Sequence, residues 1–212
     1  MKKIILFDLD GTLIDSTPAI MHSFKSAFSY FNDTNYNEEK IKSLIGYTLD
    51  DIFLKSGVKK EQIQEYIKIY KQEYRKVFLQ QTTLLPHSIK ALELAKEFAV
   101  LGVVTTKSSE SSKILLKHLK IFDYFGAIIG REDVVYPKPN AEPILKALKI
   151  LNGNLDNSFM IGDTSLDVLA AKNANINYVA LTYGYESEDS LKKNADIIKE
   201  DVYKAVEFIH KY

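Results

Sequence analysis

The sequence contains no cysteine. This absence excludes disulfides, thiolate zinc sites and catalysis by a thiol, and it fits a reducing compartment. Neither sign of charge is in excess, because 28 Lys and Arg side chains balance 28 Asp and Glu side chains. Since no net field favours DNA, RNA or an anionic membrane, any anionic ligand must be captured by a local site.

Long hydrophobic runs are also missing. The apolar run at residues 4–7 follows two lysines, as in a signal peptide, but it is too short and ends at Asp8. No stretch approaches the length that a membrane-spanning helix needs. These absences predict a soluble, cytoplasmic protein that binds neither nucleic acid nor membrane.

What is present is a pattern of short strands and amphipathic helices. Apolar runs at 4–7, 100–104 and 159–161 each end in small or acidic residues, which is typical of parallel strands buried on both faces. Weaker candidates lie at 127–129 and 178–181, and 196–198 is a candidate edge strand. Because helical periodicity fills the gaps, the sequence predicts an α/β fold with a doubly wound parallel sheet.

One long segment interrupts this alternation. From Thr17 to Thr83 only helical patterns occur. We therefore expect a Rossmann-like core at 1–15 and 84–212, with an inserted all-helical cap domain at 16–83 over the carboxyl edge of the sheet. Apolar and aromatic side chains recur along one face of a predicted helix, which indicates packing within the cap. They are Ile63, Tyr66, Ile67, Tyr70, Tyr74 and Val77.

Acidic residues follow two of the three strong strands. Asp8 and Asp10 are two apart in extended chain, so their side chains point to the same side, and Gly11 permits a sharp turn. Asp163 and Asp167 follow the third strand. Ligands of open α/β sheets bind beyond the carboxyl ends of the strands, and clustered carboxylates repel unless they share a cation or a proton. Oxygen ligands of this kind suit Mg²⁺.

Two further segments suggest an anion site. Thr105 and Thr106 end the second strand before a helix whose start offers free backbone N–H groups, although such residues also serve as ordinary helix caps. Lys138 lies between Pro137 and Pro139, which stiffen the backbone around a single charge.

Together, in this order and spacing, these segments resemble the haloacid dehalogenase (HAD) superfamily over nearly the whole chain. Its motifs match Asp8-Leu9-Asp10-Gly11-Thr12, Thr105, Lys138, and Gly162-Asp163 with Asp167. The position of the cap is similar too, and phosphoglycolate phosphatases are the most similar members. Two positions depart from their pattern: Thr106 stands where Asn is usual, and His87 where Gly is usual. We interpret His87 as a structural residue away from the site.

The resemblance implies a mechanism. Asp8 would be the nucleophile that forms an aspartyl-phosphate, and Asp10 would protonate the leaving alcohol and then deprotonate water. Mg²⁺ would be held by the carboxylate of Asp8, the backbone carbonyl of Asp10 and the carboxylate of Asp163.

The resemblance also assigns the residues around the phosphoryl group. Thr105, Thr106 and Lys138 would bind it. Asp167 would be a supporting partner of the metal site or of Lys138. The substrate would be a small phosphorylated metabolite, and the protein would be a monomer or homodimer.

Other functions remain open. An inorganic pyrophosphatase or a sugar-phosphate mutase, similar to β-phosphoglucomutase, would use the same core. A dehalogenase is disfavoured because those enzymes lack the second acid of the first motif, which is Asp10 here. A non-catalytic phospho-receiver also clusters acids and a lysine at a sheet edge, but such domains are shorter and lack a helical insertion.

Overall fold

The computed structural model describes residues 2–212. A six-stranded sheet with the order β5-β4-β1-β6-β7-β8 forms the core, and all its neighbouring strands pair in parallel. The strands are β1 (Lys3–Phe7), β4 (Ala99–Val104), β5 (Phe125–Ile129), β6 (Ser158–Gly162), β7 (Asn177–Leu181) and β8 (Ile198–Lys199). All six predicted strands are present, with small shifts at their ends.

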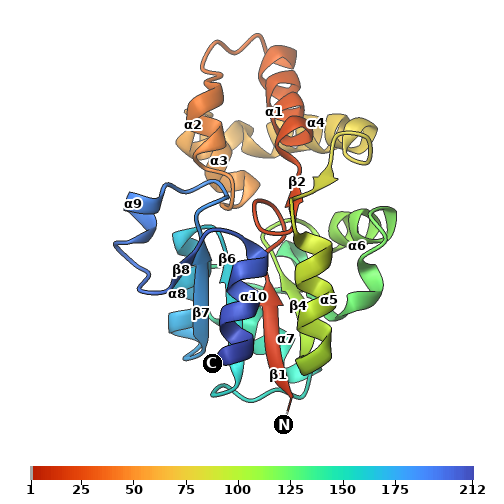
Figure 1. The fold of residues 1–212 in the computed structure, drawn as a ribbon. Helices are drawn as coiled ribbons and strands as arrows, with labels where there is room; N and C mark the ends of the chain where they lie inside the picture. Colours follow the sequence, from red (N-terminus) through yellow and green to blue (C-terminus); the bar gives the residue numbers. More distant parts are fainter. Residues whose placement is uncertain (1) are drawn as a thin grey trace.

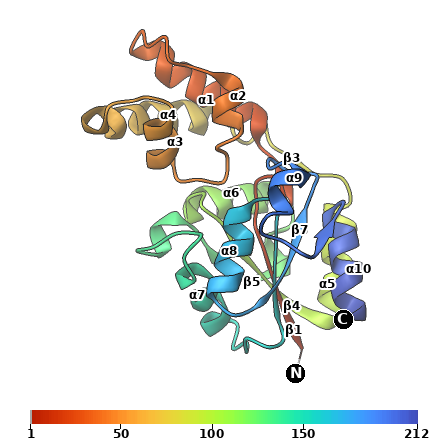
Figure 2. The same cartoon turned by 90° about the vertical axis from the view of Figure 1, so that its left-hand side faces the viewer.

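Helices cover both faces of this sheet (Figure 2). Helices α5 and α10 pack on each other on one face, while α7 and α8 lie on the other, which confirms the doubly wound α/β fold. The helices of the core are α5 (Ser88–Phe98), α6 (Ser109–His118), α7 (Glu142–Ile150), α8 (Ser165–Asn173), α9 (Glu188–Leu191) and α10 (Val202–Lys211). Single turns of 3₁₀ helix lie at η2 (Phe122–Tyr124) and η3 (Arg131–Asp133).

Between β1 and α5 the chain leaves the core as a helical insertion, residues 16–82, which lies above the sheet in Figure 1. Its elements are α1 (Thr17–Tyr30), α2 (Glu38–Lys42), α3 (Leu49–Lys55), η1 (Lys60–Gln62) and α4 (Ile63–Val77). The chain enters and leaves it through a short antiparallel ribbon of β2 (Ile14–Asp15) and β3 (Thr83–Leu84), which the sequence pattern did not predict.

The insertion has an aromatic interior. The ring of Phe24 on α1 lies 4.9 Å from that of Phe53 on α3 and 4.6 Å from that of Tyr70 on α4, measured between centroids. Tyr70 belongs to the predicted stripe, whose members are buried except for the half-buried Val77, so packing within the insertion is confirmed. Across residues 2–212, each helix is either too short or too polar to cross a bilayer.

The topology brings distant residues to one edge. Both termini lie at the end of the core away from the insertion, so the parallel strands point their carboxyl ends toward it (Figure 1). Asp8 follows β1, Thr105 follows β4, and Asp163 follows β6, and these are adjacent strands of the sheet. The predicted site residues therefore meet between the core and the insertion.

Candidate active site

Asp8 and Asp10 follow the central strand β1. The backbone N–H of Asp8 donates to the carbonyl oxygen of Ile161 at 2.9 Å, so Asp8 still belongs to the ladder with β6. The chain then turns at Gly11, whose φ of +79° is a left-handed conformation that glycine adopts without steric cost. A Cβ at this position would overlap the side chain of Asp163. The turn therefore needs glycine to bring β1's acids against the acid that follows β6.

Asp163 is fully buried at the end of β6. The Thr12 hydroxyl donates to its Oδ1 at 2.9 Å, and the backbone N–H of Tyr185 donates to its Oδ2 at 2.9 Å. Tyr185 lies in the loop after β7, where a side chain on Gly184 would overlap Asp163. Sequence reasoning missed this loop, although it follows a predicted strand and so had to reach the same edge.

Lys138 is the buried cation of this edge. Its Nζ lies 3.0 Å from Asp8 Oδ1 and 2.5 Å from Asp167 Oδ1, and it donates to the Val104 carbonyl oxygen at 3.1 Å. The other oxygen of Asp167 accepts from the Thr164 backbone N–H and hydroxyl at the start of α8, at 3.1 and 2.8 Å. Asp167 is thus held between the helix N-terminus and Lys138.

Three buried carboxylates lie close together at this edge, and Lys138 forms ion pairs with two of them, Asp8 and Asp167. Asp8, Asp163 and Asp167 each offer an oxygen, and these oxygens lie within 4.8 Å of one another. Burial raises the pKa of Asp8 from 3.8 to about 6, with Lys138 lowering it and Asp167 raising it. Burial, then the charges of Asp8 and Asp167, raises the pKa of Asp163 well above 3.8. Burial disfavours the charge of Lys138, but Asp167 and Asp8 outweigh it and raise the pKa of the lysine.

The residues present fit a divalent cation. Their donors are carboxylate oxygens, which Mg²⁺ prefers, and they carry more negative charge than Lys138 can offset. Asp8 Oδ1 is buried, and within residues 2–212 no donor makes a well-aligned hydrogen bond to it, despite the ion-pair distance to Lys138. The carboxylate of Asp10 is outside this group, so only its backbone carbonyl could serve the predicted metal site.

We expect Mg²⁺ to raise the melting temperature more at about pH 7.5 than at about pH 5. Without metal, the pKa of Asp8 is about 6 in the folded chain and 3.8 ordinarily. Between these values the folded state binds more protons than the unfolded state, so stability falls as pH rises. Mg²⁺ offsets this loss only where the carboxylates are ionised.

Scanning fluorimetry with and without Mg²⁺ at both pH values measures this difference. Asp163→Asn is the matched control, because it removes one charge from the group and is expected to abolish most of the Mg²⁺ effect. An equal stabilisation at both pH values would contradict the metal site.

The end of β4 supplies Thr105 and Thr106. Thr105 is buried, and its Oγ1 accepts from the backbone N–H of Lys107 at 3.2 Å. The Thr106 hydroxyl instead donates to the carbonyl oxygen of Gly46 in the insertion, at 2.8 Å. Thr106 therefore contacts the insertion, and phosphate binding by either threonine stays a prediction.

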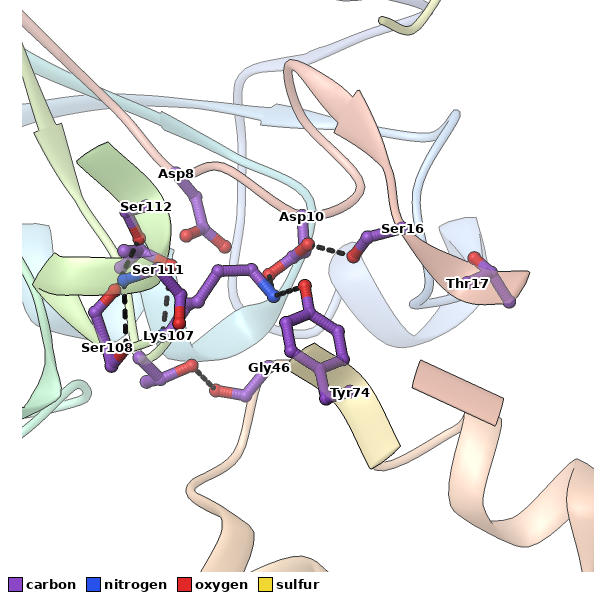
Figure 3. A network of polar contacts seen from close by, with 12 residues as sticks. Asp8, Asp10, Ser16, Thr17, Gly46, Tyr74, Lys107, Ser108, Ser111 and Ser112 are labelled. Carbon is purple, nitrogen blue, oxygen red and sulfur yellow. Dashed lines mark hydrogen bonds and ion pairs between the residues drawn. The ribbon is translucent and has the colours of Figure 1, made fainter. Parts of the chain in front are cut away.

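Lys107 is a site residue to which the sequence pattern gave no role. Its Nζ lies 3.0 Å from Asp10 Oδ2 and donates to the Tyr74 hydroxyl at 2.9 Å (Figure 3). The Ser16 hydroxyl donates to the other oxygen of Asp10. Burial alone would lower the pKa of Lys107, but Asp10 and Tyr74 outweigh it and raise that pKa well above 10.5. Its place after two threonines at a strand end was the available signal.

A cavity of about 360 Å³ lies between the core and the insertion. Asp10 and Lys107 line it from the core, and the loop at residues 46–49 and helix α4 line it from the insertion. The loop of Gly46 therefore faces the cavity from the insertion. This volume lies in the range of pockets that bind small molecules.

Comparison with known proteins adds independent information. Residues 5–181 match the model of the family described as haloacid dehalogenase-like hydrolase. Pyrophosphatase PpaX of Bacillus mycoides is 29% identical, over 92% of this chain and 94% of that protein. A probable phosphatase of Dickeya dadantii, IndB, is 31% identical, over 91% and 86%. A haloacid dehalogenase-like hydrolase from Streptococcus pneumoniae, of known structure, has a TM-score of 0.87 and 28% identity, over 98% of both chains.

Proposed function

Because the chain belongs to the family of haloacid dehalogenase-like hydrolases, we propose that it is a magnesium-dependent phosphatase, which hydrolyses small phosphate monoesters through an aspartyl-phosphate on Asp8. The observation that supports this most is the buried group of Asp8, Asp163 and Asp167, of which Asp8 and Asp167 pair with Lys138. Residues 16–83 would act as the cap domain over it.

Asp8 is the nucleophile of this proposal. One of its oxygens forms a bond to phosphorus while the bond from phosphorus to the ester oxygen breaks. Lys138, 3.0 Å from Asp8, offsets negative charge on the attacking carboxylate and, with Thr105 and Thr106, holds the phosphoryl group. Mg²⁺, held by Asp8, the Asp10 carbonyl and Asp163, would supply further charge neutralisation for the phosphoryl oxygens.

Asp10 moves the protons. It donates one to the leaving alcohol. It then accepts one from the water that attacks the phosphorus of the aspartyl-phosphate, while the bond from phosphorus to the Asp8 oxygen breaks and the carboxylate is restored. Asp10 lines the cavity, where a leaving group would lie. Asp8, at the end of β1, is only 4% exposed. This separation suits one acid that attacks and another that exchanges protons.

Inorganic pyrophosphate is the second candidate substrate. One relative is named a pyrophosphatase, and Lys71 and Arg75 line the cavity on consecutive turns of α4. Neither makes an ion pair with another residue in the range 2–212, so both are available for a second phosphate.

We expect Mg²⁺-dependent release of phosphate from p-nitrophenyl phosphate and from at least one small metabolite. The panel should include 2-phosphoglycolate, a hexose phosphate and pyrophosphate, with each rate measured again after chelation and after Mg²⁺ is restored. Stimulation by a bisphosphate together with a long-lived aspartyl-phosphate would indicate a mutase. Halide release without Mg²⁺ would indicate a dehalogenase, and no turnover of any substrate would contradict the proposed function.

A further inference from the structure

Lys107 joins three parts of the protein. It lies in the loop between β4 and α6, and its side chain extends between Asp10, which follows β1, and Tyr74 on α4 of the insertion (Figure 3). Its Nζ is 3.0 Å from Asp10 Oδ2 and 2.9 Å from the Tyr74 hydroxyl oxygen. Because Ser16 donates to Asp10 Oδ1, each carboxylate oxygen of Asp10 has one partner.

The pair of Lys107 and Asp10 differs from the surface ion pairs of this chain. Its side chains are 9% and 13% exposed, whereas those of Lys192 and Glu188 are 59% and 55% exposed. Surface pairs contribute little to stability, and a buried pair contributes little more once the cost of removing both charges from water is included. What a buried, hydrogen-bonded pair does provide is a fixed direction for each group. The placement of this pair therefore points to a role in geometry rather than in stability.

We propose that Lys107 is a positioning residue, which fixes the Asp10 carboxylate for proton transfer and, through Tyr74, makes that placement depend on the position of the insertion. The proposal rests on the proposed function, in which Asp10 exchanges protons with the leaving alcohol and with water. Tyr74 is buried and its ring stacks on that of Tyr70, with centroids 5.7 Å apart, so its hydroxyl is a fixed reference point on α4.

The proposal predicts which kinetic constant changes. Lys107→Met removes the partner of Asp10 Oδ2 while leaving Thr105, Lys138 and the buried acids intact. Since general acid–base catalysis contributes about 10²- to 10⁴-fold, misplacing Asp10 should lower kcat by about 10- to 100-fold. KM should stay within about threefold of wild type, because the change acts on the transition state. Tyr74→Phe should lower kcat in the same direction by a smaller factor.

A double-variant cycle separates positioning from a merely structural role. If Lys107 acts through Asp10, Lys107→Met should change kcat little in a protein that already carries Asp10→Asn. The double variant also removes both charges of the pair, so it has no buried unpaired charge and remains measurable if Lys107→Met alone folds poorly. Tyr66→Phe is the matched control, because it removes a buried hydroxyl from the same helix, 2.8 Å from Asp33 and outside the cavity lining.

The experiment measures kcat and KM with an alkyl phosphate for wild type, the three single variants at 107, 74 and 10, the double variant and the control. A fall in kcat that is absent in the Asp10→Asn background, with Tyr66→Phe close to wild type, supports the proposal. Equal factors in both backgrounds, or a raised KM with unchanged kcat, overturn it while leaving the proposed function in place. Absence of turnover by the wild-type protein would overturn the proposed function and this inference with it.

Discussion

Asp8→Asn is expected to lower kcat by a factor on the order of 10⁴ or more, because the variant has no nucleophile to attack phosphorus. An amide is a poor nucleophile, and no other carboxylate can replace it. Asp163 accepts two hydrogen bonds, and Asp167 is held by Lys138 and Thr164. Phosphate release with Mg²⁺ at saturating substrate measures the effect. Asp10→Asn should show the next largest loss, about 10²- to 10⁴-fold, because it removes acid–base catalysis but keeps the nucleophile.

Stability distinguishes a lost nucleophile from a lost fold. The raised pKa of Asp8, about 6, means that its ionised form destabilises the folded chain at neutral pH when no metal is present. Asp8→Asn should therefore melt at a higher temperature than wild type without Mg²⁺, and should gain less from added Mg²⁺. A variant that is both folded and fully active would contradict the assignment of the nucleophile.

Lys138→Met is expected to reduce the free energy of unfolding by about 3–5 kcal/mol at neutral pH, because it leaves buried carboxylates without their cation. The ammonium lies 3.0 Å from Asp8 and 2.5 Å from Asp167, and its side chain is 2% exposed. Methionine preserves much of the length and loses only the charge and the hydrogen bonds. Urea unfolding without Mg²⁺ measures the loss, and turnover should be lost as well.

A second substitution tests the cause of this destabilisation. Adding Asp167→Asn to Lys138→Met removes the carboxylate at the shorter distance, so it should restore part of the stability while turnover stays absent. A Lys138→Met protein within about 1 kcal/mol of wild type would show that the buried charges are compensated in another way.

Most of the fold could be predicted because its strands are buried on both faces. β1, β4 and β6 are largely apolar runs, and nearly all their residues are buried, as that pattern predicts. The ribbon of β2 and β3 escaped notice because strands of two residues are too short to show any periodicity. His87 has a φ of 66°, a left-handed conformation, and its Nδ1 lies 2.7 Å from Asp201 Oδ2. These features suit the structural role that we expect for it.

The site was predictable where residues follow strong strands or, for Lys138, lie in a short motif between two prolines. Asp8, Asp163 and Lys138 come together as the motifs suggested, although their catalytic roles remain proposals. Lys107 contacts the insertion through Tyr74, and Tyr185 in the loop after β7 contacts Asp163. Both contacts depend on how these segments pack against the edge of the sheet, which local sequence does not determine. Tyr74 shows this limit well, because one side chain both packs in the insertion and contacts the site.

The central claim is that Asp8, in a site that requires a divalent cation, becomes phosphorylated during turnover. Rapid acid quench during turnover, reduction with borohydride and peptide mass spectrometry convert an aspartyl-phosphate to homoserine and identify its position. Homoserine is expected at position 8, dependent on both Mg²⁺ and substrate, and it should be absent in Asp8→Asn. Modification at another residue, or an equal yield at position 8 without Mg²⁺, would contradict it.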